Sequence, residues 1–310
     1  MKEVHLIFGT GPLGRFTAES LLESGHKVKL INRCGNMPLP PKGAQIIAAD
    51  ALKLNPKEDL FKDVTAIYQC SQPPYHQWSE LFPSLQNAIL SFAIENQTKL
   101  IVAENLYMYG NTHGEPMTEN TPYNPCSIKG RVRMEMSIML MDSYKEGKVQ
   151  VSLIRGSDFF GPWEPIFGKM IFKAALQRKP LNFLGSLNQP HTFTYVKDFG
   201  KALAIAGTDD RSIGKIWHVP SGKPYTQQEI ADIISKKLGY PLKSRATGKF
   251  ILSFVGLFDK GAKEIIEMLY EFNEPFIMNS DAMEKTFGLS PTSMEKRIEE
   301  TLEWAKSQLN

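Results

Sequence analysis

The chain has 310 residues, 42% of them hydrophobic, which is enough for a large core and predicts two closely joined domains. Its formal net charge of +3 is small and dispersed, so neither nucleic acid nor a membrane is expected as the main partner. The cysteines Cys34, Cys70 and Cys126 form no C-x-x-C, so neither a disulfide framework nor a zinc site is indicated, no metal is expected, and a reducing cytoplasm fits.

No targeting or membrane-spanning segment is expected from the sequence. After Met1, Lys2 and Glu3 the chain enters a strand directly, so we expect no signal peptide. The most apolar later run, residues 250–258, contains a serine and a glycine and is too short to cross a bilayer.

The first predicted elements, residues 4–32, are a strand, a glycine-rich turn, a helix and a second strand. The turn reads Gly-x-Gly-x-x-Gly, in which Gly9 permits the tight turn, Gly11 lets the backbone approach a pyrophosphate, and Gly14 lets the helix pack closely. Glycines alone would also suit an ordinary turn. The strand before and the helix after them favour a nucleotide-binding site. A helix N-terminus offers free N–H groups to an anion. The residues predicted to bind the cofactor here are Gly9, Thr10, Gly11, Pro12, Leu13 and Gly14.

The end of the second strand predicts which dinucleotide binds. An NAD site normally has Asp or Glu there for the ribose hydroxyls, whereas this chain has Asn32 followed by Arg33. A neutral amide does not repel a 2′-phosphate and a guanidinium can pair with it, so NADP is preferred and NAD remains possible. Alternatively, Arg33 is an ordinary surface charge.

The later elements alternate in the same way as the first ones. Strands are predicted at 44–48, 64–70, 99–103 and 149–154, and helices at 78–96 and 128–145. Such alternation predicts an α/β fold with a Rossmann-type, doubly wound parallel sheet and right-handed crossovers.

Beyond residue 160 the alternation stops, and most segments read as helices. We expect a dinucleotide-binding domain at 1–160, to which residues 191–220 return with strands near 192–196 and 215–219. Residues 161–190 and 221–310 should form a smaller, mostly helical cap that closes a substrate cleft.

The helix at 128–145 is apolar on more than one face. Its methionines and other apolar residues would suit a helix covered by its own sheet on one side and by a second copy on the other, which makes a homodimer possible. Burial under the C-terminal segment would explain the pattern nearly as well.

Several segments in order carry a family likeness. The glycine turn is followed by Asp50, by LYMYG at 106–110, by IRGSDFFGP at 154–162, by HTFTYVKD at 191–198 and by a closing segment at 281–304. Together they resemble the extended short-chain dehydrogenase/reductases, the NAD(P)-dependent epimerase/dehydratase family, over nearly the whole chain. The resemblance implies that Asp50 lies near the adenine.

The residues that carry the family's chemistry are changed. In the family, a Tyr-x-x-x-Lys passes a proton while hydride moves to or from the nicotinamide. Here Lys129 aligns with the tyrosine, Arg133 with the lysine, and Asn105 with the serine or threonine that holds the substrate oxygen. Arg133 can orient or pair charge but cannot relay a proton, whereas Lys129 could carry one beside the nicotinamide.

Lys129, Arg131 and Arg133 also form a basic cluster in the first two turns of the predicted helix. One interpretation is a solvated basic face. Cations at a helix N-terminus oppose the helix dipole unless an anion lies there, so we favour a site for a phosphate or carboxylate of cofactor or substrate.

Five further residues are candidates. Tyr107 and Tyr109 would face the same side as Asn105 if the strand continued, and either phenol could replace the lost acid, or both could simply pack. The resemblance places Ser157 beside the nicotinamide and Asp158 at the substrate. His191 aligns with a phosphate-binding arginine of nucleotide-sugar enzymes, and a neutral imidazole is a poorer diphosphate clamp.

These residues predict an NADP-preferring oxidoreductase, or an epimerase/dehydratase, acting on a small and possibly sugar-like carbonyl or hydroxyl compound. The alternative is a non-catalytic NADP-binding sensor or regulator, which the missing tyrosine, lysine and serine favour.

Overall fold

A seven-stranded parallel sheet forms the centre of the computed structural model, which describes residues 2–258 and 260–309. The strand order is β10-β6-β5-β4-β1-β2-β3. The strands are β1 (Val4–Phe8), β2 (Lys27–Asn32), β3 (Gln45–Ala48), β4 (Val64–Gln69), β5 (Lys99–Glu104), β6 (Val151–Arg155) and β10 (Lys215–His218). This order, with the crossovers reversing direction between β1 and β4, confirms the doubly wound Rossmann-type prediction.

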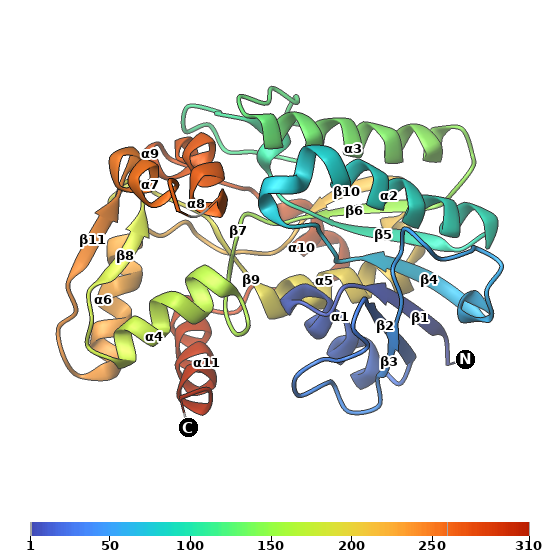
Figure 1. Cartoon of the computed structure of the whole chain (residues 1–310), viewed down its shortest axis with the longest axis horizontal. Helices are drawn as coiled ribbons and strands as arrows, with labels where there is room; N and C mark the ends of the chain where they lie inside the picture. Colours follow the sequence, from blue (N-terminus) through green and yellow to red (C-terminus); the bar gives the residue numbers. More distant parts are fainter. Residues whose placement is uncertain (1, 259, 310) are drawn as a thin grey trace.

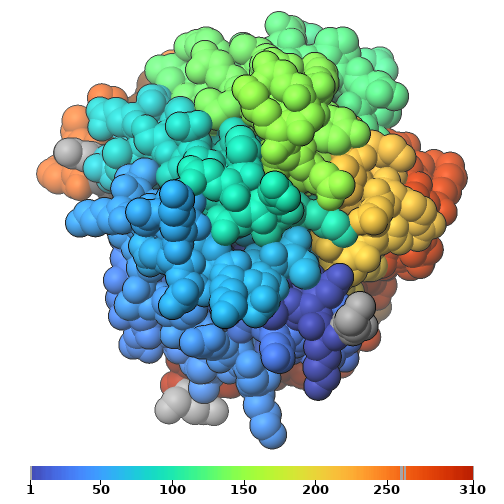
Figure 2. All heavy atoms as spheres, turned by 90° about the vertical axis from the view of Figure 1, so that its right-hand side faces the viewer, coloured from blue at the N-terminus to red at the C-terminus, as the bar shows by residue number. Residues whose placement is uncertain are grey.

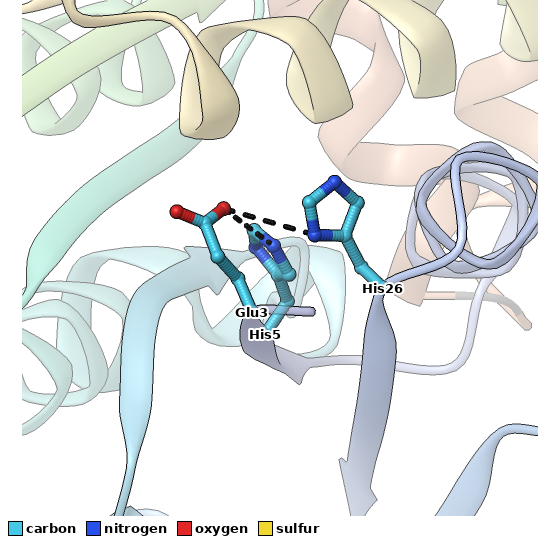
Figure 3. A group of neighbouring side chains, drawn as sticks. All are labelled: Glu3, His5 and His26. Carbon is cyan, nitrogen blue, oxygen red and sulfur yellow. Dashed lines mark ion pairs between the residues drawn. The ribbon is translucent and has the colours of Figure 1, made fainter. Parts of the chain in front are cut away.

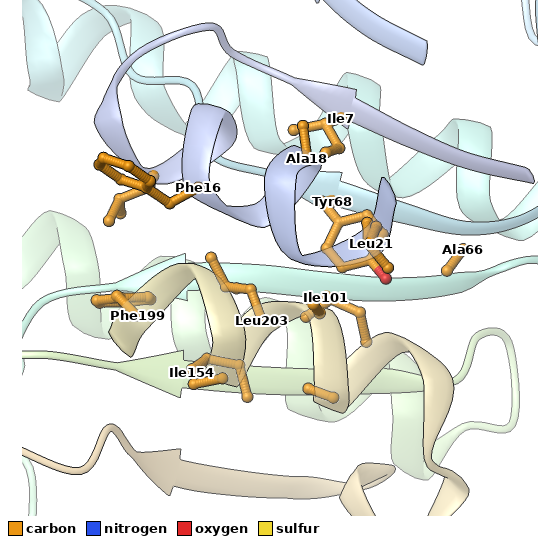
Figure 4. Packing of buried hydrophobic residues seen from close by; sticks show 14 of the residues in the cluster. Ile7, Phe16, Ala18, Leu21, Ala66, Tyr68, Ile101, Ile154, Phe199 and Leu203 are labelled. Atoms are coloured by element: carbon orange, nitrogen blue, oxygen red, sulfur yellow. The ribbon is translucent and has the colours of Figure 1, made fainter. Parts of the chain in front are cut away.

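Helices cover both faces of this sheet (Figure 1). On one face lie α1 (Pro12–Glu23) and α5 (Val196–Thr208), and on the other lie α2 (Trp78–Glu95) and α3 (Ile128–Lys145). Figure 4 shows the apolar core between α1, α5 and the sheet, where Phe16, Phe199 and Leu203 pack. The two helices approach closely because Gly200 has no side chain: a Cβ there would lie 2.4 Å from the backbone carbon of Phe16.

The apolar faces of α3 are mostly covered within the chain. Gln86 of α2 donates a hydrogen bond of 2.8 Å to the carbonyl of Met136, which ties the two helices together. The large apolar residues of α3 that stay exposed are Ile128 and Ile138, at 53% and 44%. Burial within the chain therefore accounts for most of the pattern, and the homodimer stays a prediction.

Residues 156–195 leave the main sheet, which corrects one expectation. The strand predicted near 192–196 is β9 (Phe193–Tyr195), and it pairs with β7 (Asp158–Phe160) in a separate two-stranded sheet. The chain turns away from the main sheet at Gly156, where a Cβ would lie 2.6 Å from the ring of Phe199. Of the two strands expected to return, β10 is the one that joins the main sheet, beside β6.

The remaining elements form the cap, at the left of Figure 1. They are α4 (Ile171–Leu176), β8 (Leu181–Leu184), α6 (Gln227–Leu238), β11 (Ser244–Thr247), α7 (Lys249–Val255), α8 (Lys260–Ile265), α9 (Tyr270–Asn273) and α11 (Met294–Ser307). β8 and β11 pair in parallel, so the cap contains a small sheet that the sequence did not predict. By contrast, α10 (Asp281–Phe287) packs on the edge of the main sheet, with the rings of Phe287 and Trp217 5.0 Å apart. The division at residues 160 and 220 stays a prediction.

Short helical turns complete the connections. They are η1 (Asp59–Phe61), η2 (Tyr75–Gln77), η3 (Tyr107–Tyr109), the π-helical turn η4 (Pro165–Met170), η5 (Asp210–Ser212) and η6 (Ile266–Met268). None of the helices in the described part of the chain is long and apolar enough to cross a membrane.

Candidate active site

Two pockets lie at the carboxyl ends of the parallel strands, where ligands bind in open α/β sheets. The smaller pocket, about 210 Å³, is lined by the ends of β1, β2 and β3. The larger, about 460 Å³, is lined by the end of β5, by β7 and by cap residues. Gln72 lines both pockets, so they adjoin one another.

The glycine turn lies at the smaller pocket and leaves room for an anion. Gly9 has a φ of +113°, and a Cβ there would lie 2.7 Å from the backbone carbon of Cys70. A Cβ at Gly11 would have no atom within 4 Å, so the start of α1 faces open space. No side chain caps this helix end and no acidic residue lies in its first turn. The N–H groups therefore stay available for an anion.

The other predicted residues of this turn fix its conformation. A Cβ at Gly14 would lie 2.0 Å from the carbonyl oxygen of Gly9, so only glycine fits where the helix crosses the turn. Pro12 is the first residue of α1, and the side chain of Leu13 is buried in the core. Thr10 accepts a hydrogen bond of 2.9 Å from Asn32 Nδ2.

Asn32, Arg33 and Asp50 lie together at the smaller pocket. The Asn32 amide also donates to the carbonyl of Asn36 (2.7 Å) and accepts from the Gly35 N–H (2.6 Å), so it holds the turn that follows β2. Arg33 is exposed and has no ion-pair partner among the described residues. Asp50 accepts from the Leu52 N–H at 3.1 Å.

Buried hydroxyl groups along the two pockets lack partners. In the described part of the chain, the Oγ atoms of Ser71, at the smaller pocket, and Ser157, at the larger, make no hydrogen bond. Because an unpaired buried hydroxyl costs free energy, both groups are suited to hydrogen-bond with a polar ligand. Together with the open space at Gly11, these hydroxyls fit a dinucleotide that extends from one pocket into the other.

Asn105 and Tyr107 line the larger pocket, but Tyr109 does not. The expectation that all three face one side is wrong, because β5 ends at Glu104 and the two tyrosines lie in the 3-10 turn η3, with Met108 between them. Tyr107 instead accepts a long hydrogen bond from the hydroxyl of Tyr75 (3.4 Å). Burial holds the pKa of Tyr107 well above its ordinary value.

Tyr109 belongs to a buried charge cluster behind the pocket. Its hydroxyl lies 2.9 Å from Nε2 of His218 and accepts from Arg155 at 2.7 Å. Arg155 pairs with Glu104 at 2.8 Å, and both side chains are fully buried. Sequence reasoning missed this pair, although Glu104 and Arg155 occupy matching positions on neighbouring strands. Opposite charges at the ends of two adjacent predicted strands were the available signal.

Lys129 is buried, and its charge is balanced by carboxylates of the same chain. Its ammonium pairs with Glu264, and with Glu267 at 3.0 Å, and lies 4.5 Å from the ring centre of Tyr75. Glu267 also accepts a hydrogen bond of 2.7 Å from the Ile128 N–H at the start of α3. The anion expected at this helix end is therefore Glu267, and Lys129 is not among the residues lining the larger pocket.

Arg133 is buried one turn further along α3. It donates to the carbonyl of Ala103 at 3.1 Å and lies over the ring of Phe82 at 5.0 Å. Burial lowers its pKa from the ordinary value. Neither cation is part of a solvated basic face, whereas Arg131 between them is exposed.

Asp158 and His191 form a pair at the larger pocket. His191 Nε2 lies 2.8 Å from Asp158 Oδ2, and Nδ1 lies 3.0 Å from the carbonyl oxygen of Glu271. A carbonyl only accepts, so Nδ1 carries a hydrogen, and the short contact at Nε2 then requires a shared proton. Asp158 is the member of the pair that lines the pocket, and its side chain is 18% exposed.

The charged lining of the larger pocket is acidic. Besides Asp158 it includes Glu164 and Glu271, and none of the described lining side chains is Lys or Arg. Burial raises the pKa of Glu164 to about 8 and holds the pKa of Glu271 well above its ordinary value. Glu271 Oε1 is buried without a hydrogen-bond partner in the described chain. The rest of the wall is largely aromatic: Tyr75, Trp78, Tyr107, Phe159, Phe167, Phe272 and Phe276.

Known structures share this architecture. MoeE5 in complex with UDP-glucose and NAD superposes with a TM-score of 0.79 at 17% identity, over 99% of this chain and 100% of the other. The UDP-glucuronic acid 4-epimerase from Bacillus cereus in complex with NAD gives 0.77 at 17% identity, with the same coverage. These identities show a shared fold.

Sequence comparison agrees with the fold. An uncharacterised protein, y4nL, of Sinorhizobium fredii (strain NBRC 101917 / NGR234) is 25% identical over 141 residues, which are 45% of this chain. The match spans only 39% of that relative's length. Residues 6–219 match the NAD dependent epimerase/dehydratase family, whose cofactor is a pyridine nucleotide. The chain, from its glycine turn to its last sheet strand, belongs to the NAD dependent epimerase/dehydratase family.

Proposed function

We propose that the chain is an NADP-preferring oxidoreductase, or an epimerase/dehydratase, acting on a small carbonyl or hydroxyl compound. The observation that carries this is the adjoining pair of pockets, with the glycine turn at one and Asn105, Tyr107, Ser157 and Asp158 at the other. A bound nicotinamide would supply hydride transfer in the larger pocket. The chain's residues would bind, orient and exchange the proton.

The cofactor is held along the carboxyl edge of the sheet. The N–H groups at Gly11 and the start of α1 bind the pyrophosphate, Asp50 lies towards the adenine, and Ser157 towards the nicotinamide. The amide of Asn32 brings no negative charge to the ribose, and the guanidinium of Arg33, which has no ion-pair partner among the described residues, is free to bind a 2′-phosphate. The structures named above contain NAD, so the preference for NADP rests on these two residues.

The proton is handled by Asp158 and His191 rather than by a tyrosine. Asp158 lines the pocket and His191 lies 2.8 Å behind it, so a carboxyl group within reach of a bound substrate is held in place by an imidazole. Lys129 remains the carrier predicted from its alignment, but its ammonium is held by two carboxylates outside the lining. We therefore give Lys129 a positioning role: it fastens the η6 segment, which carries the pocket residue Met268, to α3.

The substrate is small and carries no diphosphate. The lining has three carboxyl groups, and none of the described lining side chains is a Lys or Arg that could pair with a diphosphate. An uncharged or cationic compound is compatible with Asp158, Glu164 and Glu271. This fits His191, which pairs with Asp158 where an arginine clamp would otherwise lie.

A non-catalytic NADP sensor is the second candidate. One observation favours it: Lys129, at the position of the family's catalytic tyrosine, is held by two carboxylates of the chain, and Arg133, at the position of the lysine, is buried and donates to the carbonyl of Ala103. A sensor would bind NADPH but transfer no hydride.

The test is a metabolite screen in which the absorbance of the nicotinamide is followed with NADP⁺ and with NADPH. Once a substrate is found, Asp158→Asn should reduce turnover by a factor of about 10² to 10⁴ and leave NADPH affinity unchanged. Lys129→Met should lower the apparent affinity for substrate more than the turnover number. If Lys129→Met lost turnover while Asp158→Asn kept it, Lys129 and not Asp158 would be the residue that transfers the proton. NADPH binding without turnover on any metabolite would favour the sensor.

A further inference from the structure

Three potential metal ligands meet at the amino ends of β1 and β2, the edge of the sheet opposite to the two pockets. Glu3 and His5 are two residues apart, so their side chains leave the strand on the same side. His26 lies just before β2, and the Lys27 N–H donates to the Glu3 carbonyl at 2.9 Å, which holds Glu3 beside His26. Figure 3 shows the Glu3 carboxylate turned towards both imidazole rings.

The ligand atoms are close but not hydrogen-bonded. Glu3 Oε2 lies 3.4 Å from His5 Nε2 and 3.7 Å from His26 Nδ1, and the three atoms all lie within 4.8 Å of one another. The two rings meet edge to face with centroids 4.7 Å apart. Both nitrogens are buried, and neither has a hydrogen-bond partner among the described residues.

An ordinary hydrogen-bonded cluster does not account for this geometry. N–H···O bonds are usually about 2.7–3.2 Å long, and buried polar atoms are rarely left unpaired. The other nitrogen of His5, Nδ1, lies 2.9 Å from the hydroxyl of Tyr68. A histidine that binds a metal commonly uses its second nitrogen in this way, which orients the first towards the ion.

We propose that Glu3, His5 and His26 bind a divalent transition metal of the Zn²⁺ class. Imidazole nitrogen and carboxylate oxygen are ligands that Zn²⁺ favours, and three protein ligands leave a fourth position for water. Metal–ligand bonds of roughly 2.0–2.2 Å in a tetrahedral site place neighbouring ligand atoms about 3.3–3.5 Å apart. The Glu3–His5 spacing already suits this, and the Glu3–His26 spacing requires a shift of a few tenths of an ångström. The two imidazole nitrogens lie within 4.8 Å of each other, so a turn of the partly exposed loop residue His26 must bring its nitrogen closer to that of His5.

The residues around the cluster tolerate the positive charge of a bound metal ion and the small shift of the ligand side chains. Glu3 contributes a negative charge and is 37% exposed, so water can reach the ion. The nearby Lys99 is paired with Asp210, which weakens its repulsion of a cation. His26 closes the turn after α1, where Gly25 takes a φ of +84°. Figure 2 shows this side of the molecule, where the first residues reach the surface beside the segment that contains Asp210.

The metal would act as a structural cross-link. It joins the start of β1 to the turn between α1 and β2, and so fixes the two strands that carry the glycine turn and Asn32 at their far ends. Because the cluster lies at the amino ends of the strands, it does not touch the cofactor pockets. Cysteine spacing in the sequence gives no sign of this cluster, because its ligands are one glutamate and two histidines.

The experiment is equilibrium dialysis of tag-free, chelator-treated protein against Zn²⁺, together with thermal unfolding. We expect one saturable equivalent of Zn²⁺ per chain and a melting temperature that rises with Zn²⁺ concentration. His26→Gln and Glu3→Gln should each weaken Zn²⁺ binding at least about tenfold and remove the rise in melting temperature. Both side chains reach the surface, so the metal-free variants should have the same melting temperature as the metal-free wild type.

The matched control is His113→Gln. His113 also lies beside a carboxylate, that of Glu274 at 3.2 Å, but has no second histidine nearby in the described chain. This variant should bind Zn²⁺ like the wild type, and NADPH affinity should be the same in all variants. The absence of a saturable equivalent, or wild-type Zn²⁺ affinity in both His26→Gln and Glu3→Gln, would overturn the proposal.

Discussion

The preference for NADP can be tested by removing one exposed cation, Arg33. Its guanidinium lies at the rim of the smaller pocket with no ion-pair partner among the described residues. A charge-assisted bond to a phosphate contributes about 1.5–3 kcal/mol, and because Arg33 is exposed we expect a value near or below the lower end of that range, about 1–2 kcal/mol. Arg33→Ala should therefore weaken NADPH binding roughly 5- to 30-fold.

The measurement is a fluorescence titration of wild type and variant with NADPH and with NADH. NADH has no 2′-phosphate, so its affinity should be nearly unchanged in Arg33→Ala. Added salt should weaken NADPH binding to the wild type more than to the variant, because it screens an exposed charge pair. The control is Lys53→Ala, which removes an exposed cation that does not line either pocket. Equal affinities of the wild type for NADPH and NADH would refute the reasoning.

Three further predictions concern the turn, the buried charges and pH. Gly11→Val should abolish binding of either dinucleotide in a folded protein, because its side chain would fill the open space before α1; binding retained in titrations would mean that the site lies elsewhere. Glu104→Gln leaves the buried Arg155 without its counter-charge and should lower the free energy of unfolding in urea by about 3–5 kcal/mol, whereas Asp281→Asn on the surface should not change it. Burial raises the pKa of Glu164 from 4.5 to about 8, so the folded state keeps a proton that the unfolded state releases, and the wild type should lose stability relative to Glu164→Gln as the pH rises from about 5 to about 8. Parallel stability curves for the two proteins would contradict that pKa.

Local patterns in the sequence predicted the nucleotide half of the molecule well. The turn of Gly9 to Gly14 and the helix at 128–145 follow from residues within one element, and the structure has α3 at Ile128–Lys145. Asn32, Arg33 and Asp50 meet because the carboxyl ends of parallel strands share one edge of the sheet. Spacing and periodicity are enough for such features.

The catalytic half depended on contacts that no local pattern contains. The partners of Lys129 are Glu264 and Glu267, more than 130 residues away, so the anion at the start of α3 could not be identified from the sequence. Tyr109 was misplaced because a 3-10 turn replaced the last strand residues and turned its ring towards His218. The pairing of β9 with β7 was missed because three-residue strands carry almost no periodic signal.

Hydride transfer in the larger pocket is tested most directly by following an isotope from the cofactor to the substrate. NADPH deuterated at the transferable position of the nicotinamide would be incubated with the protein and a panel of small uncharged and cationic carbonyl compounds, and the products examined by mass spectrometry. We predict one deuterium in the alcohol product of at least one compound, and its loss in the Asp158→Asn variant at unchanged NADPH affinity. Tight NADPH binding with no deuterium transferred to any compound would contradict the claim and leave a nucleotide-binding protein without chemistry.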